Sequence, residues 1–147
     1  MMTRTLWLVV AFSATFAAAA PAARLPGVRT PSRNIECFVV PVRPTTHSNL
    51  LCTIKTAAYT GLLQRRCISP PTGLDWHGFQ LPDTGPARVV CSGGILYDAR
   101  DRPVLRTLAY GAVWRSGPYT CRSRIAGLTC TAGSHGLFLS RAAWRAW

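Results

Sequence analysis

The sequence contains few acidic residues and almost no lysine. Its 147 residues include 5 Asp and Glu against 17 Lys and Arg, for a formal net charge of +12, and Lys55 is the single lysine. Glycoside hydrolysis needs two carboxylates on facing elements, so this acid-poor composition makes that chemistry a poor expectation. The acidic residues are Glu36, Asp75, Asp83, Asp98 and Asp101, of which the last three stand in turn-like contexts.

Metal and thiol chemistry are disfavoured by other absences. The sequence has no CxxC or CxxH pair at the spacing of a structural zinc site, and His47, His77 and His135 are scattered far apart. The cysteine count is even, whereas a catalytic thiol would need an unpaired cysteine. We therefore expect no metal and no cofactor.

The sequence has one long apolar run, at the N-terminus, and lacks such runs after it. Arg4 precedes an apolar run that ends in a series of alanines. This is the pattern of a signal peptide over residues 1–22, with cleavage after Ala19 or Ala22. The alternative, an anchored transmembrane helix, would need about 20 apolar residues, and the run is shorter. We expect a secreted or periplasmic product that has no transmembrane segment.

Six cysteines follow this predicted signal, and an oxidising destination favours disulfide bonds between them. The segment CRSRIAGLTC has two short β-like runs around a turn, which places its two cysteines opposite each other on a hairpin. A similar unit brackets a proline-rich polar loop earlier in the chain, and elimination leaves the third pair. The expected pairs are Cys37 with Cys52, Cys67 with Cys91, and Cys121 with Cys130.

Turn signals rich in Gly and Pro recur at short intervals, separated by short runs of Val, Ile, Leu, Thr, Tyr and Trp. This pattern predicts one mainly β domain over residues 23–147, as a small antiparallel sheet, sandwich or barrel. Thr56–Arg66 has some helical composition but is interrupted by Gly61. Ser140–Trp147 offers an N-cap serine before AAWRAW, which predicts a short C-terminal helix.

The C-terminal segment carries the candidate binding residues. On a helix, Arg141 and Arg145 would share one face, while Trp144 and Trp147 would share another. Basic and aromatic faces of this kind are typical of a small interfacial anchor. We favour the competing interpretation, in which one or both tryptophans close the core over the final hairpin while the arginines stay solvated.

An enzyme would need a nucleophile and a positioned base. The best candidates for the nucleophile and the base are Ser134 and His135 in an AGSHG turn, with Asp75 or Asp98 as the orienting carboxylate. The same turn is better explained as a hairpin turn, with glycines that adopt positive φ and a serine or histidine that bonds the local backbone. His77 fits a loop position better than a base. We therefore assign no catalytic residue.

Several segments carry a family resemblance: RTPSRNIEC (29–37), LCTI (51–54), DWHG (75–78), LAYG (108–111), GLTC (127–130) and GLFLSR (136–141). Together they resemble an uncharacterised family of exported bacterial six-cysteine domains, a domain of unknown function whose members show TPSGNIGC, RCDI, DWG, LxYG, GVTC and GHGFxLSR. The chain departs from this pattern at Arg33 and Glu36, where the family has glycines. It also departs at Thr53, which replaces an aspartate, and at His77, which precedes the glycine of DWG. The resemblance implies a secreted, disulfide-bonded domain and no activity.

The strong positive charge should attract polyanions. We expect a non-enzymatic binding or structural role in the cell envelope or outside the cell, with an anionic envelope polymer or a protein as partner. A specific nucleic-acid function is not favoured, because no basic run interleaves with aromatic residues. The alternatives are a small secreted hydrolase that acts on wall or extracellular polymer, and an inhibitor that presents the loop over Pro41–Asn49.

Overall fold

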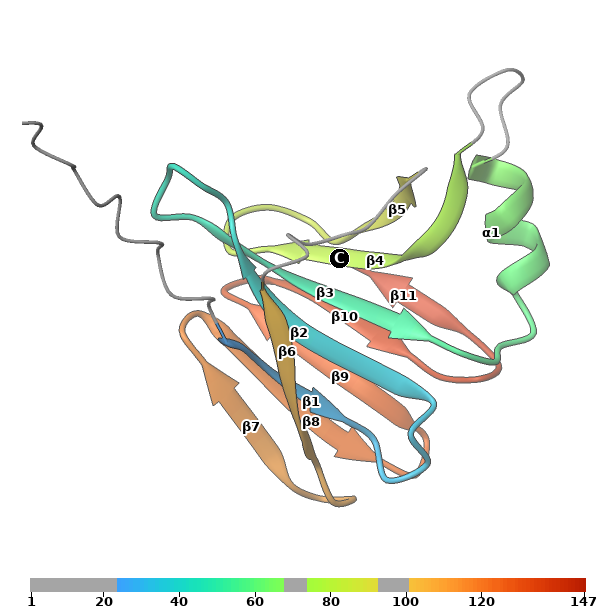
Figure 1. Ribbon diagram of the computed structural model, residues 1–147. Coiled ribbons are helices and arrows are strands. Elements are labelled where there is room, and N and C mark those ends of the chain that lie inside the picture. Colours follow the sequence, from blue (N-terminus) through green and yellow to red (C-terminus); the bar gives the residue numbers. More distant parts are fainter. Residues whose placement is uncertain (1–23, 68–73, 93–100) are drawn as a thin grey trace, which may run out of the picture.

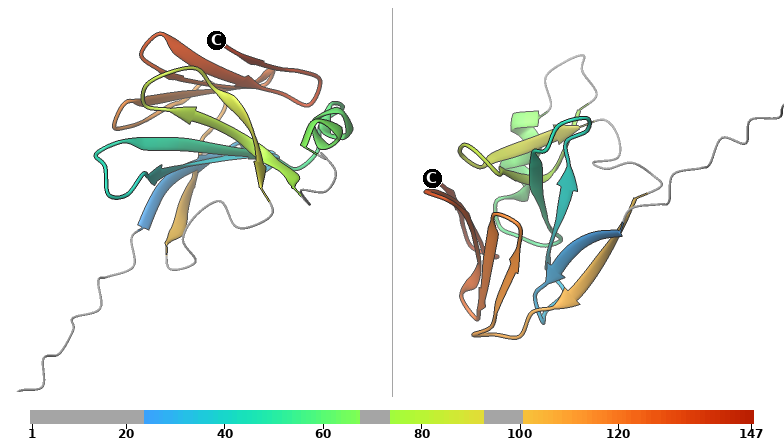
Figure 2. Two further views of the ribbon diagram at one scale, coloured as in Figure 1. Left: turned by 90° about the horizontal axis from the view of Figure 1, so that it is seen from above. Right: turned by 90° about the vertical axis from the view of Figure 1, so that its left-hand side faces the viewer.

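The computed structural model describes residues 24–67, 74–92 and 101–147, and it consists of two β-sheets with one helix (Figure 1). The predicted signal peptide and Asp98 lie outside the described residues. The two sheets form two layers (Figure 2), and buried side chains from both contribute to a shared core. The mainly β fold expected from the sequence is confirmed, as a sandwich.

The first sheet has the strand order β5-β4-β3-β2-β1-β6. Neighbouring strands are antiparallel except β1 and β6, which pair in parallel. Its strands are β1 (Arg24–Arg29), β2 (Ile35–Pro41), β3 (Ser48–Ile54), β4 (Asp75–Pro82), β5 (Arg88–Ser92) and β6 (Arg102–Thr107). The helix α1 (Thr60–Cys67) follows β3 and packs beside β4.

The second sheet is an antiparallel meander with the order β11-β10-β9-β8-β7. Short turns join its strands, which are β7 (Val113–Ser116), β8 (Tyr119–Arg124), β9 (Gly127–Ala132), β10 (His135–Leu139) and β11 (Trp144–Ala146). Because side chains alternate along a strand, one face of this sheet is apolar and packs on the first sheet. The other face is turned away from the core.

All three expected disulfides are confirmed. Cys37 and Cys52 are opposite each other on β2 and β3, and the Cys121–Cys130 pair has the same relationship on β8 and β9. The Sγ atoms of Cys37, Cys52 and Cys130 lie within 4.8 Å of one another, so these two disulfides meet across the core, one from each sheet. The remaining pair ties the end of α1 to β5. Since every sulfur in this cluster is in a disulfide, the cluster is not a metal site.

The expectation of a C-terminal helix is wrong. Trp144–Ala146 instead form the edge strand β11 beside β10, after a turn in which the Ser140 hydroxyl both donates to the Ala143 carbonyl and accepts from its N–H, each at 3.0 Å. Two turns of isolated helix are marginal in water, whereas pairing with β10 satisfies the backbone of both strands. The helix of this fold lies instead within the weaker helical segment, despite Gly61.

Among the described residues, no helix combines the length and the apolar character needed to cross a membrane.

Candidate anion-binding face on the second sheet

The alternation along β8 separates core residues from exposed arginines. Tyr119, Cys121 and Ser123 are buried, and the intervening Arg122 and Arg124 are exposed. The Tyr119 hydroxyl donates to the Ser48 carbonyl at 2.7 Å, which anchors this strand to the first sheet. The direction in which Arg122 and Arg124 project is thus set by the packing of their neighbours in the core.

The strand register aligns side chains from four strands in one row across the sheet. Arg122 is opposite Thr129, Thr129 is opposite Phe138, and Phe138 is opposite Arg145. Directly opposite residues have closely spaced Cβ atoms. The row therefore brings together two arginines that are far apart in the chain, with a threonine and a phenylalanine between them.

These residues line a shallow groove of about 570 Å³. We call this surface the arginine face, and its residues are Thr120, Arg122, Arg124, Ala126, Thr129, Thr131, Phe138 and Arg145. The Arg145 guanidinium carbon lies 5.3 Å from the centroid of the Phe138 ring. This is a cation–π contact between the guanidinium group and the face of the ring. The surface combines cations, hydroxyls and one aromatic ring.

No acidic residue offsets this charge within the second sheet, because all five acidic residues of the chain precede residue 102. Within the described ranges, Arg122 and Arg124 have no ion-pair partner. Clustered like charges repel one another, and a bound anion relieves that repulsion. Planar guanidinium groups are suited to carboxylate and phosphate because they donate two parallel hydrogen bonds.

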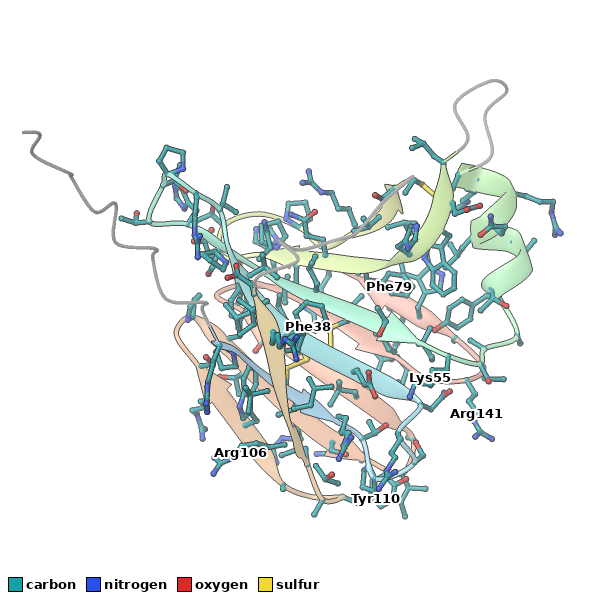
Figure 3. All side chains as sticks on the ribbon, in the orientation of Figure 1. Phe38, Lys55, Phe79, Arg106, Tyr110 and Arg141 are labelled. Atoms are coloured by element: carbon teal, nitrogen blue, oxygen red, sulfur yellow. A yellow bond between two sulfur atoms is a disulfide. The ribbon has the colours of Figure 1, made fainter. Side chains whose placement is uncertain are left out.

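The positive surface extends beyond the arginine face at both edges. Arg124 also lines a cavity of about 440 Å³ at the end of the sandwich, where Arg141 lies. At the opposite edge Arg115, the register partner of Thr120, lines a third cavity of about 300 Å³ together with Arg24 and Arg106. In Figure 3, Arg106 of β6 lies at the lower left and Arg141 at the lower right of the molecule.

The predicted binding residues of the C-terminal segment do not lie on the faces that a helix would give them. On the strand, Arg145 projects from the arginine face, and Trp147 follows it on the same side next to Gly136. Trp144 points inward, where its ring centroid lies 5.0 Å from that of Phe79. Arg141 lies in the turn before β11. The expected pairing of the two tryptophans on one face is therefore wrong, since a strand alternates with period two.

The candidate catalytic residues do not form a constellation in the described part of the chain. Ser134 and His135 are at the turn between β9 and β10, and among the described residues His135 forms no hydrogen bond to a carboxylate. His77 stands in an irregularity of β4 between Trp76 and Gly78. The Asp75 carboxylate accepts a hydrogen bond from Gln64 Nε2 at 2.6 Å. These residues do not supply a nucleophile with a positioned base.

A histidine–carboxylate pair does exist, but at residues that the sequence did not indicate. His47 Nδ1 lies 3.1 Å from Asp83 Oδ2, and the Ser48 N–H donates to the same oxygen at 3.0 Å. The adjacent Ser48 hydroxyl contacts the Tyr119 hydroxyl at 3.2 Å, and among the described residues it has no hydrogen bond to His47. The pair ties the β2–β3 loop to the residue that follows β4.

The environment of Asp83 affects its ionisation. Desolvation acts to raise the pKa of this carboxyl group, but hydrogen bonds from the Ser48 N–H and from His47, together with the charge of His47, outweigh it and lower the pKa below its ordinary value. The pair therefore favours the ionised carboxylate, which suits a structural clamp better than an acid catalyst.

Sequence reasoning missed Arg122, Arg124 and Phe138. The signal was present in the segment YTCRSR, where every second residue is apolar or small and the others are polar or basic. That alternation predicts which arginines of one strand share a face. It does not predict that Arg145 joins them, because this depends on the pairing of β11 with β10.

Comparison of the chain with protein-family models, with curated proteins and with solved structures found no match.

Proposed function

We propose that the chain is an exported, non-enzymatic binding domain that holds an anionic polymer of the cell envelope or extracellular space on its arginine face. The observation that carries this proposal is the grouping of Arg122, Arg124 and Arg145 around Phe138 on a sheet that has no acidic residue. Such a grouping stabilises carboxylates or phosphates through charge-assisted hydrogen bonds.

An extended ligand fits this surface better than a small one. The groove is open, and it shares Arg124 with the cavity at the end of the sandwich. At its other edge Arg115 adds a further guanidinium. A polymer with repeated charges can occupy these positions at once, and linked contacts of this kind bind more tightly than any single contact.

Export is part of the same proposal. Three disulfides are typical of proteins from oxidising compartments, and the resemblance to exported bacterial six-cysteine domains agrees with this location. The hydrolase alternative is supported by no arrangement of the described histidines and carboxylates.

The proposal is tested by salt-dependent binding. The full chain, produced by secretion so that its disulfides form, is applied to a heparin matrix and eluted with NaCl, and binding to soluble polyanions is measured by calorimetry. We expect the triple variant Arg122→Ser, Arg124→Ser, Arg145→Ser to elute at much lower salt than the unaltered chain. Fewer contacts between guanidinium groups and the matrix remain in the variant, so less salt is needed to screen them.

A matched control removes the same charge elsewhere. Arg65, Arg66 and Arg88 lie on α1 and β5, and none of them lines the arginine face, so the control variant is Arg65→Ser, Arg66→Ser, Arg88→Ser. We expect this variant to retain most of the binding. Equal losses in both triple variants would show that only net charge matters, and a shortened polymer after incubation would overturn the non-enzymatic assignment.

A further inference from the structure

The end of the sandwich holds a cavity of about 440 Å³ that is built from turns rather than from the exposed sheet. Turns between β1 and β2, between β8 and β9, and between β10 and β11 meet there, joined by Tyr110 from the segment before β7. Figure 3 shows Tyr110 and Arg141 along the lower edge of the molecule. We call this the end cavity, and its volume lies in the usual range of small-molecule sites, roughly 300–1,000 Å³.

Hydrogen bonds hold the turns of the end cavity in place. The Asn34 side chain donates to the Thr56 carbonyl at 3.0 Å and accepts from the Thr56 N–H at 2.9 Å. The Arg141 carbonyl accepts from the Ala58 N–H at 2.8 Å, and the Ser140 carbonyl accepts from the Tyr59 hydroxyl at 3.0 Å. The cavity walls are thereby fixed before a ligand arrives, which lowers the entropic cost of binding.

The lining combines two cations with an exposed aromatic and apolar surface. Arg124 and Arg141 both line the end cavity, and no acidic residue does. Tyr110 is 48 % exposed and Ile125 is 89 % exposed, so an aromatic ring and an apolar side chain are accessible to a ligand. Ser32 adds a hydroxyl group, which contacts only the Thr30 hydroxyl, at 3.1 Å.

An independent observation concerns the backbone beside the cavity. Arg33 lies between the lining residues Ser32 and Asn34, and its φ is 55°, in the left-handed region that a non-glycine residue adopts at a cost. It is the only non-glycine residue in that region among those the structure describes. Strained residues concentrate at binding sites, and here the strained residue stands between two residues that line the end cavity.

We propose that the end cavity binds a sugar ring that carries an anionic group, with Arg124 and Arg141 contacting the anion and Tyr110 stacking on the ring. Aromatic and guanidinium groups together suit such a ligand because the ring presents apolar C–H groups on one face while its anion needs bidentate donors. The inference deepens the proposed function and rests on it, since Arg124 lines both surfaces and one unit of a bound polymer would occupy the end cavity.

The test uses single sugars and their separate parts as probes. Glucuronate and glucose 6-phosphate each carry a ring and an anion, glucose carries the ring alone, and inorganic phosphate carries the anion alone. We expect at least one anionic sugar to bind the full chain more tightly than both glucose and inorganic phosphate in NMR or calorimetric titrations. A carboxylate preference and a phosphate preference then identify which source of the anion the cavity accepts.

Exposed residues provide variants that should leave the fold intact. We expect Arg141→Ser and Tyr110→Ala each to weaken binding of the anionic sugar by about tenfold or more, and Tyr110→Phe, which keeps the ring, to preserve most of it. Binding of inorganic phosphate as tight as that of the sugars, or no loss in Tyr110→Ala, would overturn the proposal. So would the absence of any sugar binding.

The two proposals can fail separately. The double variant Arg122→Ser, Arg145→Ser changes the arginine face but not the end cavity, so it should lose retention on the polyanion matrix and keep sugar binding. Arg141→Ser should lose sugar binding but lose less retention than the double variant, because Arg122, Arg124 and Arg145 of the arginine face remain. Retention without sugar binding would remove the end-cavity inference alone, and sugar binding without dependence of retention on the arginine face would remove the polymer proposal alone.

Discussion

Trp147 lies so close to Gly136 that a Cβ atom on the glycine would overlap the indole ring. The same two residues exchange backbone hydrogen bonds, from Gly136 N to Trp147 O at 2.9 Å and from Trp147 N to Gly136 O at 3.1 Å. Glycine at this position is what lets the C-terminal tryptophan lie beside the arginine face, next to Arg145.

We expect Gly136→Ala to lower the free energy of unfolding by about 1–3 kcal/mol, because the indole must move away and β11 with it. Urea denaturation measures this change. The matched experiment introduces the same alanine into a Trp147→Ala background, where the overlap no longer exists and the cost should largely disappear. An equal cost in both backgrounds would contradict this account.

A second prediction compares the stability effects of two serines, one whose hydroxyl has no hydrogen-bond partner and one whose hydroxyl makes two hydrogen bonds. Ser123 is fully buried, and its hydroxyl has no hydrogen-bond partner in the described structure. We expect Ser123→Ala to leave stability unchanged or raise it by up to about 1 kcal/mol, since it removes an unsatisfied polar group. Ser140→Ala removes two bonds of the turn before β11 and should cost about 1 kcal/mol. Thermal unfolding of both variants compares them, and a larger loss at Ser123 than at Ser140 would be inconsistent with the structure.

The pair His47–Asp83 predicts a specific acid sensitivity. The pKa of Asp83 is lower in the fold than in the unfolded chain, so the carboxylate stabilises the protein at a pH above its unfolded value of about 3.9, and this contribution is lost as the pH falls through the lower folded value. Asp83→Asn removes the group. We expect the stability difference between the two proteins to be fully present at about pH 5 and to shrink below about pH 4. A difference that stays constant down to pH 2 would rule out this linkage.

The disulfides should differ in their resistance to reduction. Cys91 is exposed, whereas Cys37, Cys52, Cys121 and Cys130 are each at most 1 % exposed in the core. Because a thiolate must reach a sulfur atom to cleave the bond, we expect mild reductant to open Cys67–Cys91 first. Alkylation followed by peptide mass mapping reads the order, and early labelling of Cys121 or Cys130 would disprove it.

Arg33 links stability to binding. Glycine adopts its left-handed conformation without strain, so we expect Arg33→Gly to raise the unfolding free energy by about 1 kcal/mol. The same change removes a positive charge beside the end cavity and should weaken binding of an anionic sugar. Calorimetry and urea denaturation on one variant measure both effects, and a loss of stability would show that the backbone is not strained there.

Local patterns were sufficient for the mainly β class and for the two cysteine pairs that lie on hairpins, but not for every strand. Cys121 and Cys130 are close in sequence and flank one turn, so the hairpin that the residues favour also places them opposite each other. The C-terminal segment was mispredicted because its composition permits a short helix, and only the free edge of β10 makes a strand more favourable. Whether so short a segment forms a helix or a strand depends on the strand that is available to pair with it.

The sequence by itself determined the mainly β class, the two disulfide pairs that lie on hairpins and the excess of arginine over acid, because each follows from residue type or from spacing along one hairpin. Only the tertiary structure decided which arginines share a surface. Arg122 and Arg145 meet because three consecutive strand pairings carry the register from β8 to β11. Arg124 and Arg141 meet because separate turns converge at one end of the sandwich. Such proximity arises from strand pairing and core packing between distant segments, which no local pattern contains.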